Sequence, residues 1–194
     1  MTSKPPRRLP TESFSSLAET SSSVTDSEFR EAFRLHKDVL YRFACRMTGS
    51  RTLAEDVVQE SYLALWRRPG AYDPRRGAVR AFLLGIARNL ILKRWRDERP
   101  HEALDAELSI CQPVDLPAGE RAALVARAVA VLPPLQREVL ILAEYEEMSL
   151  EEIARATGTQ LAAAKSRLHR ARENLRRLLA PLWEEAGSTN GTKR

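Results

Sequence analysis

The residues best suited to bind a chemically defined partner lie between positions 165 and 172, where the sequence reads KSRLHRAR. Guanidinium and ammonium groups on one helix can donate hydrogen bonds to guanine in the DNA major groove, and neighbouring cations bind phosphate. A short helical pattern and Gly158 precede this segment, in the order of a helix-turn-helix motif. A solvated basic helix in a bundle is the alternative. We predict that duplex DNA is contacted by a recognition set: Lys165, Ser166, Arg167, His169 and Arg170.

A second group of cations is interleaved with aromatic residues between positions 67 and 96. Residues 67–77 read RRPGAYDPRRG, a turn-rich basic loop, and Asn89, Lys93 and Arg96 follow at helical spacing on one stripe. Cations beside aromatic rings suit single-stranded nucleic acid, because bases stack on the rings and phosphates pair with the cations. A charged helix face over a tryptophan-filled core is equally compatible with the bare pattern. The loop–helix set comprises Arg67, Arg68, Tyr72, Arg75, Arg76, Arg88, Asn89, Lys93 and Arg96.

A third feature is a polar patch within residues 54–60, AEDVVQE. Asp56, Gln59 and Glu60 lie near one another on a helix whose other face is apolar. Such a patch suits a protein partner, although most patches of this kind are simply solvated. The pattern alone does not decide between the two.

Catalytic and metal-binding patterns are missing from the sequence. The three histidines, His36, His101 and His169, are scattered, and neither a phosphate-binding glycine loop nor a nucleophile motif is present. The two cysteines, Cys45 and Cys111, make neither a disulfide framework nor a metal-ligand cluster, and we expect Cys45 to be a buried thiol. We therefore expect no enzyme activity, no metal site and no cofactor.

Helices should position these residues, because the sequence is rich in Leu, Ala, Arg and Glu, which favour helix over sheet. We expect helices at about 25–48, 52–68, 78–96, 119–131, 134–146, 150–157 and 159–181. A Ser or Thr three residues before a Glu predicts a capping box at a helix start. Three such pairs lie at the expected helix starts: Thr25 with Glu28, Thr52 with Glu55, and Ser149 with Glu152.

The expected fold is all-α, with two small helical domains joined by a flexible linker. We predict a disordered tail at 1–24, a first domain at 25–97, a linker at 98–117, a second domain at 118–183 and a tail at 184–194. The net charge of +5 is unevenly placed and follows the two basic surfaces. No apolar run approaches the ~20 residues that span a membrane, and the N-terminus lacks a signal peptide's apolar stretch. We therefore expect a cytoplasmic protein without membrane insertion.

Two long blocks of the sequence resemble the extracytoplasmic-function (ECF) group of the sigma-70 family. The segments AEDVVQESYLALWR (54–67) and RAFLLGIARNLILKRWR (80–96) are similar to that family's region 2. The segments LPPLQREVLILAEYEEMSLEEIARATG (132–158) and KSRLHRAR (165–172) are similar to its region 4. Both blocks occur in the family's order, with a short linker and no region 3 between them.

The resemblance implies an RNA polymerase sigma factor that binds core polymerase and directs it to promoter DNA, with an anti-sigma factor as a further partner. The loop–helix set would melt and read the −10 element, with one base flipped out into the loop. The recognition set would read the −35 element. The resemblance also implies a docking set that binds the clamp helices of the polymerase: Asp56, Gln59, Glu60, Leu65 and Trp66. Within this set, Leu65 and Trp66 would support the helix that carries the other three residues.

One departure concerns the start of the recognition helix. Ala162, Ala163 and Ala164 stand where the family usually has Gly-Thr-Val, so a hydroxyl that could cap the helix or touch phosphate is absent. We expect a different promoter preference and a weaker −35 affinity.

Two other functions compete with a sigma factor. A DNA-binding regulator that acts without polymerase would need only the helix-turn-helix, and it would leave the polar patch and the basic loop without a role. An enzyme is the third and least supported class. A related hypothesis is that the free chain packs its two domains together, hides its own DNA surfaces and opens on polymerase.

Overall fold

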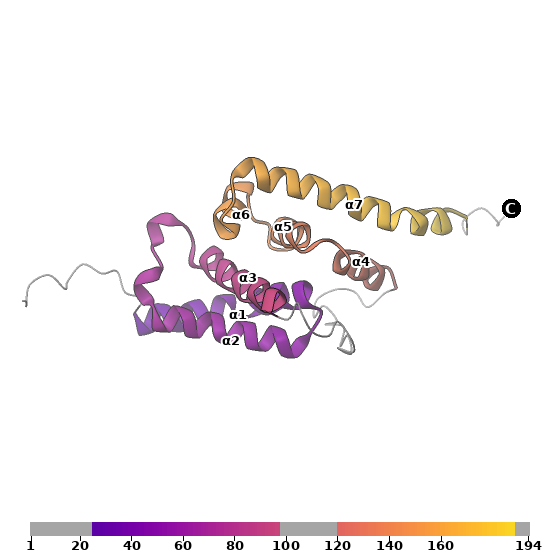
Figure 1. The fold of residues 1–194 in the computed structure, drawn as a ribbon. Coiled ribbons are helices and arrows are strands. Elements are labelled where there is room, and N and C mark those ends of the chain that lie inside the picture. The colour runs from indigo at the N-terminus through magenta and orange to yellow at the C-terminus, as the bar shows by residue number, and fades with distance from the viewer. Residues whose placement is uncertain (1–24, 98–119, 189–194) are drawn as a thin grey trace, which may run out of the picture.

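Two layers of helices make up the protein in the computed structural model, which describes residues 25–97 and 120–188. α1, α2 and α3 form one layer, and α4 to α7 form the other (Figure 1). The elements are α1 (Asp26–Thr48), α2 (Arg51–Arg67), the 3₁₀ turns η1 (Pro69–Ala71) and η2 (Pro74–Arg76), α3 (Val79–Asp97), α4 (Glu120–Ala130), α5 (Pro134–Glu144), α6 (Leu150–Thr157) and α7 (Leu161–Ser188). The expected all-α fold with two helical domains is confirmed. None of the helices in the described ranges combines the length and apolar character that crossing a membrane requires.

Local hydrogen bonds set the start and end of α1. The Thr25 side chain accepts from the backbone N–H of Glu28, and the Glu28 carboxylate accepts from the backbone N–H of Thr25 at 2.8 Å. Gly49 ends the helix in the left-handed conformation, at φ 72°. The predicted capping box at Thr52 is wrong, because Ser50 caps α2 by accepting from the N–H of Leu53. Thr52 therefore lies inside the helix.

The first layer, α1 to α3, encloses a core of large apolar side chains. Leu40, Phe43 and Met47 of α1 are fully buried against Leu65 of α2 and Leu83 of α3. The packing follows from apolar residues at helical spacing on each element. This core holds α3, and hence much of the loop–helix set, at a fixed position on α1 and α2.

The second layer contains the helix-turn-helix. Ser149 and Glu152 form the expected capping box at the start of α6, and Gly158 ends α6 in the left-handed conformation, at φ 63°. Ile153 and Ala164 are buried where α6 meets α7. Apolar residues at helical spacing in this motif predict inward packing for Leu161 as well, but Leu161 is 45% exposed at the first position of α7, so that prediction is wrong. The motif itself is formed as predicted.

The side chain of Cys45 is in a different chemical state from the free thiol that the sequence predicts. It is buried in α1, as predicted, but it is disulfide-bonded, so the prediction of a buried thiol is wrong. Cys111 lies outside the described residues, as do the predicted N-terminal tail, the whole predicted linker and the last six residues of the C-terminal tail.

The two layers pack directly against each other. α3 lies on α6, and α1 lies on α4 and α5, so the buried residues of both layers form one continuous core. Arg137 of α5 crosses the interface: it donates to the carbonyl oxygen of Met47 at 2.6 Å, and its guanidinium lies 5.6 Å from the centre of the Trp95 ring. The two sequence-defined domains therefore form one compact body in this structure.

Candidate nucleic-acid interface

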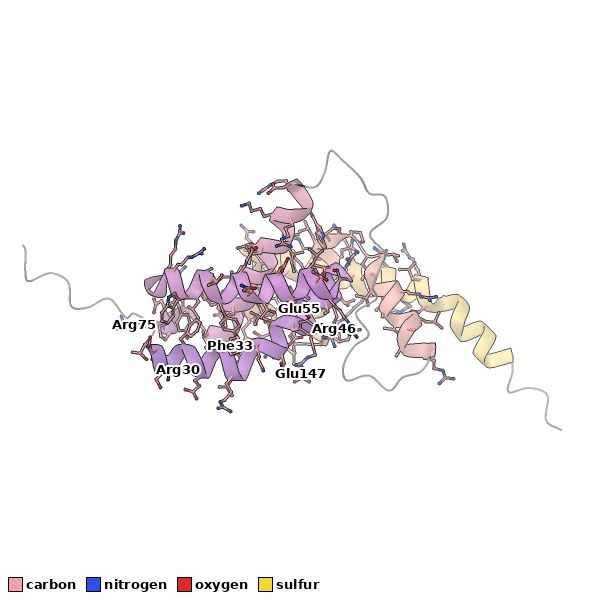
Figure 2. The ribbon with its side chains drawn as sticks, turned by 90° about the horizontal axis from the view of Figure 1, so that it is seen from below. Arg30, Phe33, Arg46, Glu55, Arg75 and Glu147 are labelled. Carbon is pink, nitrogen blue, oxygen red and sulfur yellow. The ribbon has the colours of Figure 1, made fainter. Side chains whose placement is uncertain are left out.

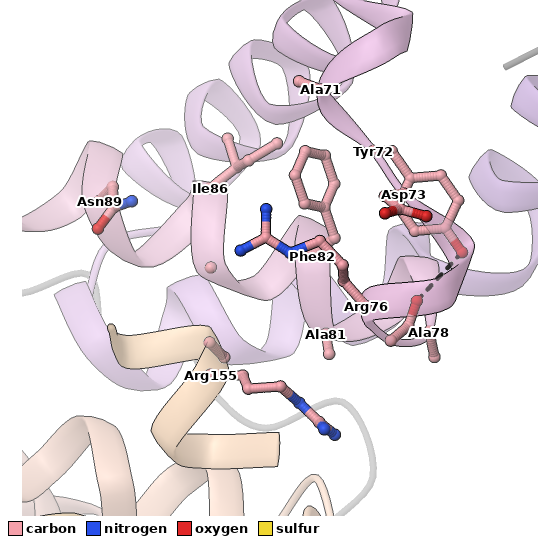
Figure 3. Close-up of a pocket in the computed structure, with 13 residues that line it drawn as sticks. Ala71, Tyr72, Asp73, Arg76, Ala78, Ala81, Phe82, Ile86, Asn89 and Arg155 are labelled. Carbon is pink, nitrogen blue, oxygen red and sulfur yellow. Dashed lines mark hydrogen bonds between the residues drawn. The ribbon is translucent and has the colours of Figure 1, made fainter. Parts of the chain in front are cut away.

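The basic loop between α2 and α3 shapes a hollow of about 380 Å³, which we call the loop pocket. Figure 3 shows Tyr72 and Phe82 side by side in it, with ring centres 5.5 Å apart. The Tyr72 hydroxyl donates to the carbonyl oxygen of Gly77 at 3.3 Å, which closes the loop on itself. Arg76 and Asn89 also line the pocket. Aromatic rings beside a cation and an amide offer a flat base both stacking and hydrogen bonds.

The remaining members of the loop–helix set are spread along the surface. Arg67, Arg68 and Arg75 are exposed around the loop, and Lys93 and Arg96 are exposed further along α3. The structure therefore places Tyr72, Arg76 and Asn89 in the lining of the loop pocket. The other exposed cations of the set lie on the surface outside the pocket.

Arg88 is directed away from solvent. Its Nε donates to Glu138 Oε2 at 2.7 Å, and its Nη2 donates to Glu138 Oε1 at 3.2 Å. Arg167 of α7, from the recognition set, lies on the same carboxylate, with Nη1 3.7 Å from Glu138 Oε1. Glu138 is 0% exposed, and burial raises its pKa despite the hydrogen bonds and charge of Arg88. One buried carboxylate thus holds one arginine from each predicted DNA surface.

A second buried carboxylate joins the same two layers. Glu146 is 2% exposed and accepts from Arg80 of α3 at 3.1 Å, with the guanidinium of Arg46 of α1 at 3.8 Å. Burial raises the pKa of Glu146, and the two arginines act in the opposite direction. Sequence reasoning missed both glutamates, because a lone Glu in an apolar helix pattern does not reveal a partner in another domain.

The rest of the recognition set lies at the start of α7. Lys165, His169 and Arg170 are exposed, and Ser166 is half-buried. A hollow of about 520 Å³ opens between the end of α3 and the start of α7, and Arg96, Arg167 and Arg170 contribute to its lining. The two predicted DNA surfaces therefore face each other here.

The docking set divides over two sides of α2. Asp56 and Glu60 face α3, where Arg94 donates to Asp56 Oδ2 at 3.4 Å and to Glu60 Oε1 at 3.1 Å. Gln59 and Trp66 face α1 instead. Leu65 is 1% exposed, so it is a core residue and can only support α2 from within.

An aromatic groove between α1 and α2 was not predicted. Its volume is about 790 Å³, and Phe29, Phe33, Leu63 and Trp66 line it together with Gln59. Figure 2 looks onto this face of the molecule, with Phe33 and Glu55 labelled. Trp66 is 55% exposed and Phe33 is 44% exposed, so the apolar face that helical spacing marks on α1 is not wholly covered at Phe33. Two phenylalanines one helical turn apart, opposite a tryptophan, are the signal that could have revealed the groove.

Metal ligands do not assemble within the described ranges: no group of three or more His, Cys, Asp or Glu side chains could hold an ion there.

Comparison with known proteins finds a matching family region for each half of the chain. Residues 32–101 match sigma-70 region 2, and residues 122–175 match sigma-70 region 4. The ECF RNA polymerase sigma factor SigL of Mycobacterium tuberculosis is 34% identical over 158 residues, which cover 79% of this chain and 89% of SigL. The ECF RNA polymerase sigma factor SigE of Mycolicibacterium smegmatis is 34% identical over 159 residues, which cover 77% of this chain and 61% of SigE.

A solved structure has a similar fold. The sigma factor RpoE of Bartonella quintana, in complex with the anti-sigma factor NepR, superimposes with a TM-score of 0.67 at 26% identity, over 79% of this chain and 98% of RpoE. The two matched regions occur in the order of the two helical layers, and the similarity to SigL extends over most of both proteins. The chain therefore belongs to the ECF group of the sigma-70 family.

Proposed function

We propose that this chain is an ECF-type RNA polymerase sigma factor, a non-catalytic subunit that binds core polymerase and directs promoter recognition, melting and initiation. The observation that carries the proposal is the joint presence of a helix-turn-helix, with exposed Lys165 and Arg170, and a separate loop pocket with Tyr72 and Phe82. A duplex-reading motif and a single-strand pocket in one chain match an initiation factor, which must do both. We assign a region 2-like domain to 25–97, a linker to 98–117 and a region 4-like domain to 118–183.

The −10 element is the proposed ligand of the loop–helix set. A base flipped from the duplex would enter the loop pocket and stack on Tyr72, with Arg76 and Asn89 supplying polar contacts. Unstacking a base costs a few kcal/mol, and stacking of about 1–3 kcal/mol per base offsets it. Arg67, Arg68, Arg75, Lys93 and Arg96 would bind the DNA backbone beside the pocket. Arg88 must leave Glu138 before it can do the same.

The −35 element is the proposed ligand of the recognition set. Lys165, Ser166, Arg167, His169 and Arg170 belong to the first turns of α7, the part of a recognition helix that contacts base edges. Arg170 is exposed and suited to a guanine. Arg167 must leave Glu138 before it can contribute.

Core polymerase is the proposed partner of the docking set. Asp56, Gln59 and Glu60 supply polar contacts, Trp66 supplies apolar area, and Leu65 supports α2 from inside. The aromatic groove beside Gln59 and Trp66 adds to this surface. An anti-sigma factor is a further proposed partner, in line with the complex in which RpoE was solved. We place the protein in the cytoplasm, where polymerase acts.

The decisive experiment is promoter-directed transcription with purified core RNA polymerase, with and without the full-length chain, on a pool of promoter fragments from the source genome. Initiation at defined start sites only when the chain is present supports the proposal. No initiation and no co-purification with core would refute it. Sequence-specific duplex binding without polymerase would then favour the stand-alone DNA-binding regulator.

A further inference from the structure

The hollow between the end of α3 and the start of α7, which we call the α3–α7 pocket, has an apolar wall that includes an aromatic ring. Leu92 and Trp95 of α3 form part of this wall, and Pro133, Pro134 and Leu135 at the start of α5 form the rest. The volume of the pocket is about 520 Å³. Sites for small molecules have volumes of about 300–1,000 Å³ and mostly apolar walls with a few polar groups. The α3–α7 pocket therefore has the size and the lining of a small-molecule site.

The charged groups of the α3–α7 pocket are all positive. Arg96 of α3 and Arg167 and Arg170 of α7 line it, and no Asp or Glu side chain of the described residues does. Arg96 lies 3.7 Å from Asp97, but both side chains are exposed, and an exposed pair of this kind contributes little. A hollow lined by charges of one sign attracts ions of the opposite sign. The charge of the lining therefore favours an anionic ligand.

Arg167 has a hydrogen-bond donor without an acceptor. Its Nη1 is buried, and no group in the described part of the chain accepts a hydrogen bond from it. The nearest carboxylate oxygen with which it pairs, Glu138 Oε1, is 3.7 Å away, which is too far for a hydrogen bond. A buried donor without an acceptor costs free energy, and each such group in a folded protein calls for an explanation. Because this guanidinium belongs to the lining of the α3–α7 pocket, an oxygen acceptor bound there would provide one.

Phosphate attached to a flat base matches both parts of the α3–α7 pocket. Arginine binds phosphate oxygens through paired N–H groups, and bases stack on aromatic rings such as that of Trp95. Duplex DNA is too large for the pocket: a sphere of 520 Å³ is about 10 Å across, whereas the major groove alone is about 12 Å wide. The dimensions therefore favour a single nucleotide over a nucleic acid.

We propose that the α3–α7 pocket binds a free nucleoside phosphate, with its base against Trp95 and its phosphates on Arg96, Arg167 and Arg170. Binding of this ligand goes beyond the proposed function and does not depend on it. One consequence does rest on that function. Arg167 and Arg170 cannot hold the nucleotide and the −35 element at the same time, so the nucleotide competes with promoter DNA for α7.

The test is isothermal titration calorimetry of the full-length chain, without polymerase or DNA, at about 0.15 M salt, where surface charges are largely screened. The probes are ATP and GTP. Inorganic triphosphate carries the charge without the base, and adenosine carries the base without the charge. Two variants reverse a charge in the pocket, Arg96→Glu from α3 and Arg170→Glu from α7. The matched control is Arg177→Glu, which makes the same charge change at an exposed position of α7 outside the pocket.

We expect ATP or GTP to bind the wild-type chain with one nucleotide per chain, and more tightly than either inorganic triphosphate or adenosine. Each pocket variant should raise the dissociation constant at least about tenfold relative to Arg177→Glu, because each removes a hydrogen bond to a charged group. A loss in Arg96→Glu as well as in Arg170→Glu would show that both helices contact the ligand.

Three outcomes would overturn the proposal: neither nucleotide binds, Arg177→Glu weakens binding as much as the pocket variants do, or inorganic triphosphate binds as tightly as the nucleotides. The second would mean attraction to the net charge of the chain, and the third would mean a site for phosphate alone. If one pocket variant does not fold by circular dichroism, the other decides. A chain that binds nucleotide but fails to support transcription would refute the proposed function only, and the reverse result would refute only the nucleotide site.

Discussion

Removing the guanidinium of Arg170 should weaken recognition of the −35 element without affecting the fold. Arg170 is exposed on α7, and within the described residues it forms no ion pair, so its truncation breaks no salt bridge. An arginine that pairs with guanine contributes about 1–3 kcal/mol of discrimination. At 1.4 kcal/mol per factor of ten, Arg170→Ala should reduce promoter affinity of the holoenzyme by about 5- to 150-fold.

The assay is competition between duplex promoters for holoenzyme assembled with wild-type or Arg170→Ala chain. Promoters with each base pair substituted in the −35 element would show which position loses its preference. The matched control is Arg177→Ala, which removes an exposed cation from the same face of α7 two turns later. Affinity and base preference that are unchanged in Arg170→Ala, or changed equally in Arg177→Ala, would refute base reading by Arg170.

Three further predictions concern docking, folding and pH. Asp56→Ala combined with Gln59→Ala should lower affinity for core polymerase at unchanged melting temperature, and retained affinity would remove the docking role. Ser149→Ala should cost about 1 kcal/mol of unfolding free energy, because it deletes the cap of α6; urea denaturation measures this, and a loss below about 0.3 kcal/mol would contradict it. Burial raises the pKa of Glu138 and Glu146, so the chain binds more protons when its two layers pack together than when they are apart. Packing of the layers should therefore be favoured below the ordinary pKa of 4.5 and weaken as the pH rises through the raised values, and a radius of gyration that falls as the pH rises above 4.5 would contradict this sign.

Helix caps and tight turns were the features of the structure that could be predicted from the sequence, because they depend on residues close together in the chain. Thr25 and Ser149 cap their helices because each pairs with a glutamate three residues later, and Gly158 turns the chain because glycine tolerates a positive φ. The misassigned cap at Thr52 has a local cause as well. Ser50, two residues earlier, also offers a hydroxyl and begins the helix directly after Gly49.

Contacts between the layers could not be predicted from one sequence. Arg88 and Arg167 fit a basic DNA surface by pattern, and only the packing of α3 against the other layer directs both onto Glu138. The exposure of Phe33 has a similar origin, since helical spacing marks a face as apolar without showing whether another element covers it. Long-range packing, and not local propensity, decided these positions.

The bridge made by Arg94 links the surface proposed to bind polymerase with the helix proposed to bind promoter DNA. Arg94 belongs to α3, the helix that carries Asn89 and Lys93, and its guanidinium is shared between Asp56 and Glu60 of α2. A cationic group of the polymerase that pairs with either acid would compete with Arg94 for it. The displaced guanidinium would then add positive charge to the side of the molecule that is proposed to bind the promoter. Polymerase binding would in this way strengthen the electrostatic attraction of α3 for DNA, without any change in its backbone.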